Sequence, residues 1–346
     1  TPPRRHAATP PRRHAATPPR PLAHPAMPAP SSWSRRAFLR AGAASAAHLG
    51  LLSAVGPLGA RGLRGAQERF PVVAEEPWGR LHRVADGVWA LVSAPLEDRT
   101  TLCNGGLVAG RAGVLMVEAF GSDAGAAWMA SMAEALTGRP PTHVVLTHYH
   151  GDHTSGLRGA VEPGGAELLA TPVTRALVLE RGDEVPEAIL RGARPLDTRR
   201  PTEIDLGGRS VVVVPRRGHT ASDVSVEVQE PSVVFCGDLV WNGMFPNYRD
   251  AVPRRLGMAV RLLRARRPRV WVPGHGGFAD EEAMDRYLAL LADVEGAARR
   301  ALEEGLDAAE AAERYSIPDE LGSWRLFGPR YVETAIGAWM DLLVSA

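Results

Sequence analysis

The chain has 346 residues, of which 45% are hydrophobic, and its formal net charge is +1. Residues 1–69 carry 11 arginines and one acid, Glu68, so the rest of the chain carries a net charge of −9. An acidic remainder argues against a nucleic-acid partner, and two cysteines allow at most one disulfide. Roughly 275 residues beyond this basic segment are enough for one soluble domain with a full core.

The first 26 residues form a low-complexity repeat. The octad TPPRRHAA fills residues 1–8 and 9–16, and a third copy begins at Thr17. Because a segment rich in proline and arginine has little apolar surface to bury, we predict that residues 1–26 are disordered. The first methionine is Met27, and we expect translation to start there, with the repeats upstream of the true start.

Residues 27–66 are predicted to be an export signal. Residues 34–40 read SRRAFLR, which resembles the twin-arginine motif, and a weakly apolar, alanine-rich stretch follows over residues 41–59. Polar and helix-breaking residues interrupt this stretch, so we expect no permanent membrane anchor after cleavage. The twin-arginine translocase is therefore the expected partner during export, and the periplasm is the expected location.

From residue 70 onward the sequence predicts strands interspersed with helices. Hairpins are expected at Leu81–Val92, turning at Asp86-Gly87, and at Gly106–Phe120. Apolar residues at helical spacing predict a helix over Asp123–Leu136.

The second half of this region continues the same alternation. Hairpins are expected at Ile204–Val214 and Val224–Phe235, and helices at Arg254–Arg266, Asp280–Glu304 and Tyr331–Val344. Such interspersed elements predict an α/β layered domain over residues 70–346 and argue against an all-helical or all-β fold.

The run HYHGDH is the strongest chemical signal in the chain. It follows the apolar run 144–147 and contains four potential metal ligands, namely His148, His150, Asp152 and His153. Imidazole nitrogen and carboxylate oxygen are ligands that zinc prefers. In a compact loop the first two can converge on one ion while the other two face a second. The alternative is a polar loop that only caps a strand, and this density of ligands argues against it.

Three more ligand candidates follow strand-like runs downstream. They are His219 in RGHT, Asp238 in FCGDL and His275 in PGHGG, and each is expected on a glycine-containing turn after its strand. Strand ends at one edge of a sheet can direct distant side chains into a common cleft. A lone histidine after a strand is more often structural, but three such residues downstream of HYHGDH favour a metal site.

In this order, HYHGDH, GHT, CGDLVW and PGHGG resemble the metallo-β-lactamase-fold metallohydrolases. The similarity runs from about Val84 to the C-terminus. It implies an αβ/βα four-layer sandwich, with two mixed β-sheets face to face and helices outside. It also implies two metal sites. The first is formed by His148, His150 and His219, and the second by Asp152, His153 and His275. Asp238 is the implied carboxylate that bridges them.

The resemblance implies a hydrolase with two Zn²⁺ per chain, in which a bridging hydroxide attacks the carbonyl of a small ester, lactone, thioester or amide. Asp152 is the candidate catalytic residue, since a ligand at this place can also orient the nucleophile and move a proton. A bridging Asp238 is similar to glyoxalase II-like thioesterases and lactonases, whereas true β-lactamases generally lack it. The spacing of the motifs most resembles exported metallohydrolases found with periplasmic quinoprotein systems.

Two alternatives remain open at this point. The same ligand types also bind iron, as in persulfide dioxygenase-like oxidoreductases, and the chain could be a non-catalytic accessory protein of a periplasmic quinoprotein. A complete second ligand set favours hydrolysis.

Three further residues, Thr147, Thr220 and Asp223, are expected to lie next to the metal ligands. Glu118 stands where the family often has aspartate, and Cys236 is expected to be a small buried strand residue.

Overall fold

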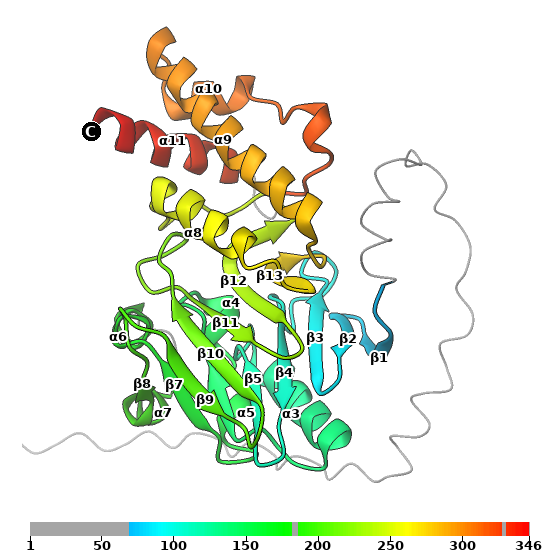
Figure 1. The fold of residues 1–346 in the computed structure, drawn as a ribbon. Helices are drawn as coiled ribbons and strands as arrows, with labels where there is room; N and C mark the ends of the chain where they lie inside the picture. The colour runs from blue at the N-terminus through cyan, green and yellow to red at the C-terminus, as the bar shows by residue number, and fades with distance from the viewer. Residues whose placement is uncertain (1–68, 182–185, 327–329, 346) are drawn as a thin grey trace, which may run out of the picture. The chain divides into compact units, whose positions relative to one another are not determined.

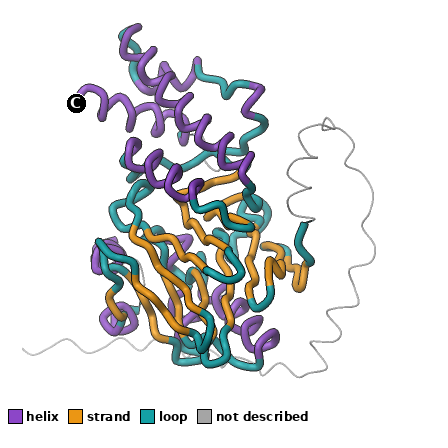
Figure 2. Tube along the Cα trace, in the orientation of Figure 1, coloured by secondary structure: helices purple, strands orange, loops and turns teal. Residues whose placement is uncertain are grey.

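The structure is a computed structural model that describes residues 69–181, 186–326 and 330–345. The repeat over 1–26 and the export signal over 27–66 lie outside the described residues, so both stay predictions. Two mixed sheets lie face to face, and helices cover their outer faces (Figures 1 and 2). Among the described residues, no helix is both long and apolar enough to cross a membrane.

The larger sheet contains eight strands in chain order. Its first five strands are antiparallel and the remaining ones parallel, so hairpins build one half and helical crossovers build the other. The strands are β1 (Val72–Glu76), β2 (Gly79–Ala85), β3 (Val88–Ser93), β4 (Gly105–Ala109), β5 (Val114–Val117), β6 (His143–Val145), β7 (Glu167–Ala170) and β8 (Arg194–Pro195).

The smaller sheet has five strands in the order β13-β12-β11-β10-β9. Its pairs are antiparallel except β12 with β13, which are parallel. The strands are β9 (Thr202–Asp205), β10 (Ser210–Pro215), β11 (Val224–Val228), β12 (Val233–Asn242) and β13 (Val270–Gly276).

The helices fall into two groups. Those packed on the larger sheet or its connections are α3 (Asp123–Thr137), α4 (Gly151–Thr154), α5 (Leu157–Val161), α6 (Pro172–Arg181) and α7 (Glu187–Gly192). Those on the side of the smaller sheet are α8 (Pro253–Ala265), α9 (Glu281–Glu304), α10 (Ala308–Arg314), the 3₁₀ turn η1 (Asp319–Leu321) and α11 (Tyr331–Val344).

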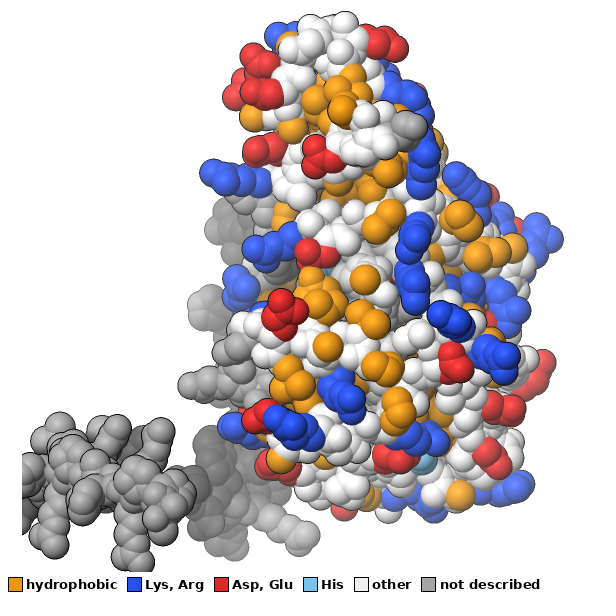
Figure 3. Space-filling model, turned by 90° about the vertical axis from the view of Figure 1, so that its left-hand side faces the viewer, with side chains coloured by type: hydrophobic (Ala, Val, Ile, Leu, Met, Phe, Trp, Pro, Cys, Tyr) orange, Lys and Arg blue, Asp and Glu red, His pale blue; other side chains and the backbone are white. Residues whose placement is uncertain are grey.

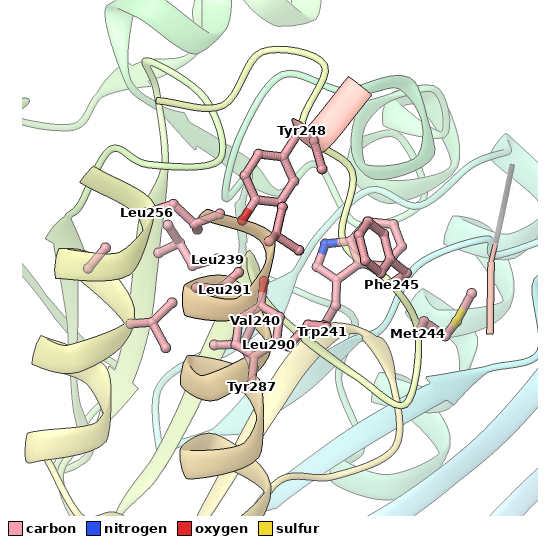
Figure 4. Packing of buried hydrophobic residues seen from close by; sticks show 14 of the residues in the cluster. Leu239, Val240, Trp241, Met244, Phe245, Tyr248, Leu256, Tyr287, Leu290 and Leu291 are labelled. Atoms are coloured by element: carbon pink, nitrogen blue, oxygen red, sulfur yellow. The ribbon is translucent and has the colours of Figure 1, made fainter. Parts of the chain in front are cut away.

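Alternation along the strands produces the layers. In β5, Leu115 and Val117 face the core between the two sheets. Val114 and Met116 face the opposite way, towards the helical layer that includes α3. The inter-sheet core is rich in valine from both sheets, which fits β-branched side chains on a pleated surface. A third cluster joins β12 to α8, α9 and α11, and Figure 4 shows Trp241, Tyr248 and Tyr287 meeting there. These four layers confirm the predicted fold class.

Most predicted elements match the structure. The hairpins over 81–92, 106–120, 204–214 and 224–235 are all present, and α11 has the predicted bounds. Helix α9 begins after Asp280, whose side chain accepts a hydrogen bond from the backbone N–H of Ala283. It ends at Gly305, which has a left-handed conformation with φ of 71°.

The predicted position of two ligand candidates was wrong. Asp238 and His275 lie inside β12 and β13, not on turns after them. Strand β12 continues through Gly237, which has φ of 52°, and the pairing with β13 shifts register there. A local irregularity therefore turns the ligand side chains inward without ending either strand.

Candidate metal centre

The HYHGDH run forms a tight connection between β6 and α4. His148 and His150 lie in the loop, and Asp152 and His153 lie in the first turn of the short helix. His219 lies in the loop between β10 and β11, while Asp238 and His275 come from β12 and β13 of the smaller sheet. The centre thus combines residues from both sheets.

The first donor set consists of His148, His150, His219 and Asp238. Nε2 of His148 and Nε2 of His219 lie 3.1 and 3.0 Å from Nδ1 of His150. Oδ2 of Asp238 lies 3.8 Å from Nε2 of His148 and 3.4 Å from Nε2 of His219. Ligand atoms around a tetrahedral zinc ion are about 3.3 Å apart, since each lies about 2.0 Å from the metal. The four donors therefore have the spacing of a tetrahedral site.

The second donor set consists of Asp152, His153, His275 and the other oxygen of Asp238. Nε2 of His153 lies 3.4 Å from Asp152 Oδ2 and 3.1 Å from Asp238 Oδ1. Nε2 of His275 lies 3.1 and 3.4 Å from the same two oxygens. Asp238 thus directs one carboxylate oxygen into each set. The structure brings together all seven predicted ligand candidates in the predicted grouping.

Buried polar atoms at this centre show that the residues fit a cation. Nε2 of His153 and Oδ1 of Asp238 are buried and make no hydrogen bond to the described residues. Leaving such an atom unsatisfied costs about 1–3 kcal/mol. In the first set, three imidazole nitrogens face one another at hydrogen-bond distance. A divalent cation bound by each set would satisfy these lone pairs.

Two side-chain contacts orient the imidazoles of the first set. The hydroxyl of Thr147 donates its proton to Glu118 Oε1, 2.5 Å away. The same hydroxyl oxygen can then accept a hydrogen bond from Nδ1 of His148, 3.0 Å away. Nε2 of His150 lies 2.8 Å from Asp250 Oδ2 and can donate to it. Each contact leaves the opposite ring nitrogen unprotonated and facing the donor set, as a metal ligand requires.

Glu118 serves both donor sets. Besides accepting from Thr147, its Oε1 lies 3.1 Å from Nδ1 of His153 in the second set. The residue is fully buried and has φ of 77°, so the chain bends sharply where β5 ends and turns the carboxylate inward. Of the three predicted neighbours, Thr147 makes direct contact with a ligand candidate.

Thr220 and Asp223 instead hold the loop that contains His219. The Asp223 carboxylate accepts hydrogen bonds from the backbone N–H and the hydroxyl of Thr220, at 2.8 and 2.7 Å. Burial raises the pKa of Asp223 to about 7.

Cys236 is buried in β12 as predicted, and both cysteines are free.

Electrostatics at the centre favour positive charge between the carboxylates. Burial lowers the pKa of His148 and brings that of His219 to about 4, so both imidazoles are neutral. For His275, burial acts in the same direction, but the carboxylates of Asp238 and Asp152 together outweigh it and raise the pKa to about 9. Burial would raise the pKa of Asp238, but His275 and His153 hold it well below its ordinary value. Divalent metals bind ionised carboxylates and neutral imidazoles, so a cation bound by the second set would replace the protons that His153 and His275 hold.

A cavity of about 590 Å³ opens onto the second donor set. Asp152, Asp238 and His275 lie in its wall, together with aromatic residues that include Trp241 and Tyr331. The indole of Trp241 stacks on the imidazole of His275, with ring centroids 4.0 Å apart. Polar groups and apolar surface around a concave site are typical of small-molecule binding.

Sequence reasoning missed Asp250 and Tyr331. Asp250 contacts His150 across 100 residues of sequence, and Tyr331 reaches the cavity from α11. No local pattern marks either residue.

Comparison with known proteins identifies the family. A sequence model described as the metallo-beta-lactamase superfamily matches residues 98–275. The chain belongs to the metallo-β-lactamase superfamily. This confirms the family indicated by the motifs.

Two curated relatives of the chain are hydrolases by name. Hydroxyacylglutathione hydrolase of Rhodospirillum rubrum is 27% identical over 192 residues, covering 55% of this chain and 68% of the relative. Metallo-beta-lactamase type 2 of Bacillus sp. (strain 170) is 26% identical over 166 residues, covering 46% and 61%. At this coarse level, the chain resembles hydrolases.

Solved structures confirm the fold. The metallo-β-lactamase of Hirschia baltica superposes with a TM-score of 0.52 at 22% identity, over 62% of this chain and 98% of that one. A sec-alkylsulfatase of Pseudomonas sp. superposes with a TM-score of 0.60 at 14% identity, over 76% and 50%. Both similarities concern the fold alone.

Proposed function

We propose that the protein is a hydrolase that holds two Zn²⁺ ions and cleaves a small ester, lactone, thioester or amide at its carbonyl carbon. The observation that carries this proposal is the position of Asp238, which directs one oxygen into each of two complete donor sets. When bound, such a pair of cations supplies Lewis acidity and lowers the pKa of water towards neutrality.

Asp152 is the residue proposed to handle the proton. Its side chain is 26% exposed, whereas those of Asp238, His153 and His275 are at most 2% exposed. It lies in the cavity wall, where it can touch a substrate and an attacking water. Burial alone would raise its pKa, but the imidazoles of His153 and His275 hold the pKa well below its ordinary value. The carboxylate is therefore ionised, as a group that orients water and takes up a proton must be before the reaction.

The bridging position of Asp238 supports esters and thioesters over β-lactams. Of the two relatives above, one is named for hydroxyacylglutathione and the other is a β-lactamase, so relatives alone do not choose between them. A bridging carboxylate is the feature by which the motifs resemble glyoxalase II-like thioesterases and lactonases.

The test is a hydrolysis panel on the zinc-loaded protein. Aryl esters, lactones and glutathione thioesters are assayed beside penicillins and carbapenems, before and after treatment with a chelator. We expect turnover of at least one ester, lactone or thioester, its loss on chelation and its return with added zinc. Efficient β-lactam hydrolysis without ester turnover would overturn the substrate class. One iron per chain in protein purified without added metal, together with no hydrolysis, would favour the oxidoreductase alternative.

We also propose that the protein is exported to the periplasm. The support is the sequence alone, namely the SRRAFLR motif followed by an alanine-rich stretch.

A further inference from the structure

We infer that the substrate carries a carboxylate remote from the bond that is cleaved, and that Arg99 and Arg249 bind this carboxylate in the wall of the metal cavity. The inference rests on the proposed function, because it names the class of substrate that the same cavity accepts. It depends on which arginines of the cavity already have partners.

Three arginines line the cavity, and they differ in their contacts. Arg181, at the end of α6, donates hydrogen bonds to the backbone carbonyl of Tyr149 and to Thr154 Oγ1. It therefore holds the HYHGDH loop. Arg99 and Arg249 are exposed, and the structure gives neither guanidinium a hydrogen bond or ion pair with the described residues. These two charges are available to a ligand.

The carboxylates next to these arginines in sequence have other partners. Asp98 accepts a hydrogen bond from the backbone N–H of Thr100 at 2.8 Å. Asp250 is bound by Nε2 of His150 at 2.8 Å. Neither acid forms an ion pair with the adjacent guanidinium, although the charge of Arg249 helps to lower the pKa of Asp250. A substrate carboxylate therefore displaces no ion pair of Arg99 or Arg249.

The charge of the whole wall points the same way. Apart from the metal ligands, the wall carries three arginines and two acids, Glu180 and Asp250. Two divalent cations would also exceed the charge of the two carboxylate ligands, Asp152 and Asp238. A concave site with an excess of positive charge attracts anions. A planar guanidinium binds a carboxylate through two parallel hydrogen bonds, which gives specificity as well as attraction.

Position distinguishes these arginines from the others on the surface. Exposed arginines are numerous, and Figure 3 shows many on one face of the molecule. Arg99 and Arg249, however, share a cavity with the metal donors and with apolar side chains that include Leu102, Leu177 and Tyr331. This combination fits a small substrate with a scissile carbonyl, an apolar middle and a terminal carboxylate. The volume of about 590 Å³ lies in the usual range for such ligands.

Binding of matched products tests the inference without turnover. Calorimetry on the zinc-loaded protein compares glutarate with monomethyl glutarate, which differ by one free carboxylate. We expect glutarate to bind about tenfold more tightly, in keeping with a charge-assisted pair. The double variant Arg99→Gln, Arg249→Gln should lose this difference, whereas Arg261→Gln, an exposed arginine of α8 outside the cavity wall, should keep it. Equal binding of the two ligands, or a difference that persists in the double variant, would overturn the inference.

Kinetics then separate this inference from the proposed function. The 4-nitrophenyl ester of glutaric acid and its methyl-capped form are compared as substrates. We expect the free acid to have the higher kcat/KM, through KM, and expect added salt to reduce its advantage. Turnover of both esters at equal kcat/KM contradicts the carboxylate site and leaves hydrolysis standing. Turnover of neither ester counts against hydrolysis of this class, while the binding comparison still decides the carboxylate site.

Discussion

At the residue scale, the metal centre depends on the space that Gly274 leaves beside Asp238. A Cβ atom added to Gly274 would lie only 2.0 Å from Asp238 Oδ1 and 2.8 Å from the backbone nitrogen of Asp238. Contacts under 3.0 Å to backbone cannot be relieved by rotating a side chain. Gly274, the first glycine of the PGHGG motif, is therefore needed for the shared carboxylate to lie between the two donor sets.

Replacing Gly274 with alanine should displace the Asp238 carboxylate. Because Oδ1 and Oδ2 belong to different donor sets, both metals should bind more weakly, and hydrolysis should fall by about 100-fold, the upper end of effects seen when support for a metal ligand is lost. Elemental analysis after dialysis, with circular dichroism to confirm folding, measures this. Gly192→Ala is the matched control, since a Cβ there would have no neighbour within 4 Å. A folded Gly274→Ala variant with two tightly held metals would refute the argument.

A second consequence at this scale concerns Asp223. Burial raises the pKa of its folded-state carboxyl to about 7, whereas an unfolded chain ionises near 3.9. Between these pH values the folded state keeps a proton that the unfolded state releases. Its contribution to stability therefore falls as pH rises from about 4 to about 7, by up to about 4 kcal/mol in total.

Asp223→Asn should remove this pH-dependent term. Urea unfolding of wild type and variant at pH 4.5 and 7, with chelator present so that metal release does not contribute, measures the difference. The wild type should lose more stability over this range than the variant does. Asp197→Asn is the control, because Asp197 is exposed and accepts hydrogen bonds from the backbone N–H groups of Arg199 and Arg200. Identical pH dependence of Asp223→Asn and wild type would contradict the assignment.

At the element scale, turn chemistry made the hairpins predictable from sequence. Asp86-Gly87 and Gly207-Gly208 lie between apolar runs, and these glycines adopt positive φ in the structure. The strand limits around Asp238 and His275 were not predictable in this way, because β12 continues past Gly237 into the buried run Leu239–Trp241. No element was predicted over residues 155–203, where the structure has short helices and strands that lack a readable period.

The same distinction applies to the site. The seven ligand candidates are histidines and aspartates, which are common metal ligands. The strand-like runs before them indicated that their side chains could meet at one edge of a sheet. Asp250 and Tyr331 could not be found, because their roles depend on contacts between segments far apart in sequence. Glu118 was visible only as a departure from aspartate, and the structure shows the longer side chain contacting both Thr147 and His153.

At the scale of the whole molecule, the helices after residue 275 add to the family domain. The family match ends at residue 275, and α9, α10 and α11 follow it. They pack on α8 and β12 through a cluster that includes Tyr248 and Tyr287, shown in Figure 4. Helix α11 also brings Tyr331 to within 6.1 Å of Trp241, ring centroid to ring centroid. The C-terminal helices therefore add to the core, and α11 also contributes Tyr331 to the cavity wall.

Export is also a property of the whole chain. If the twin-arginine translocase reads the guanidinium pair, replacing Arg35 and Arg36 together with lysine should leave the precursor in the cytoplasm. Cell fractionation followed by immunoblotting measures the distribution, and Arg40→Lys is the matched control within the same segment. Normal periplasmic delivery of the double variant would point to the general secretory route.

The central claim is that Asp238 joins two donor sets into one dinuclear centre. Its most direct test is the metal content of wild type and Asp238→Asn, measured by elemental analysis of protein purified without added metal and then titrated with zinc. We predict two zinc ions per wild-type chain. In the variant the second ion should be lost first, since the neutral amide no longer offers a charged oxygen to both sets. Two tightly held ions and full hydrolytic activity in Asp238→Asn would contradict the account.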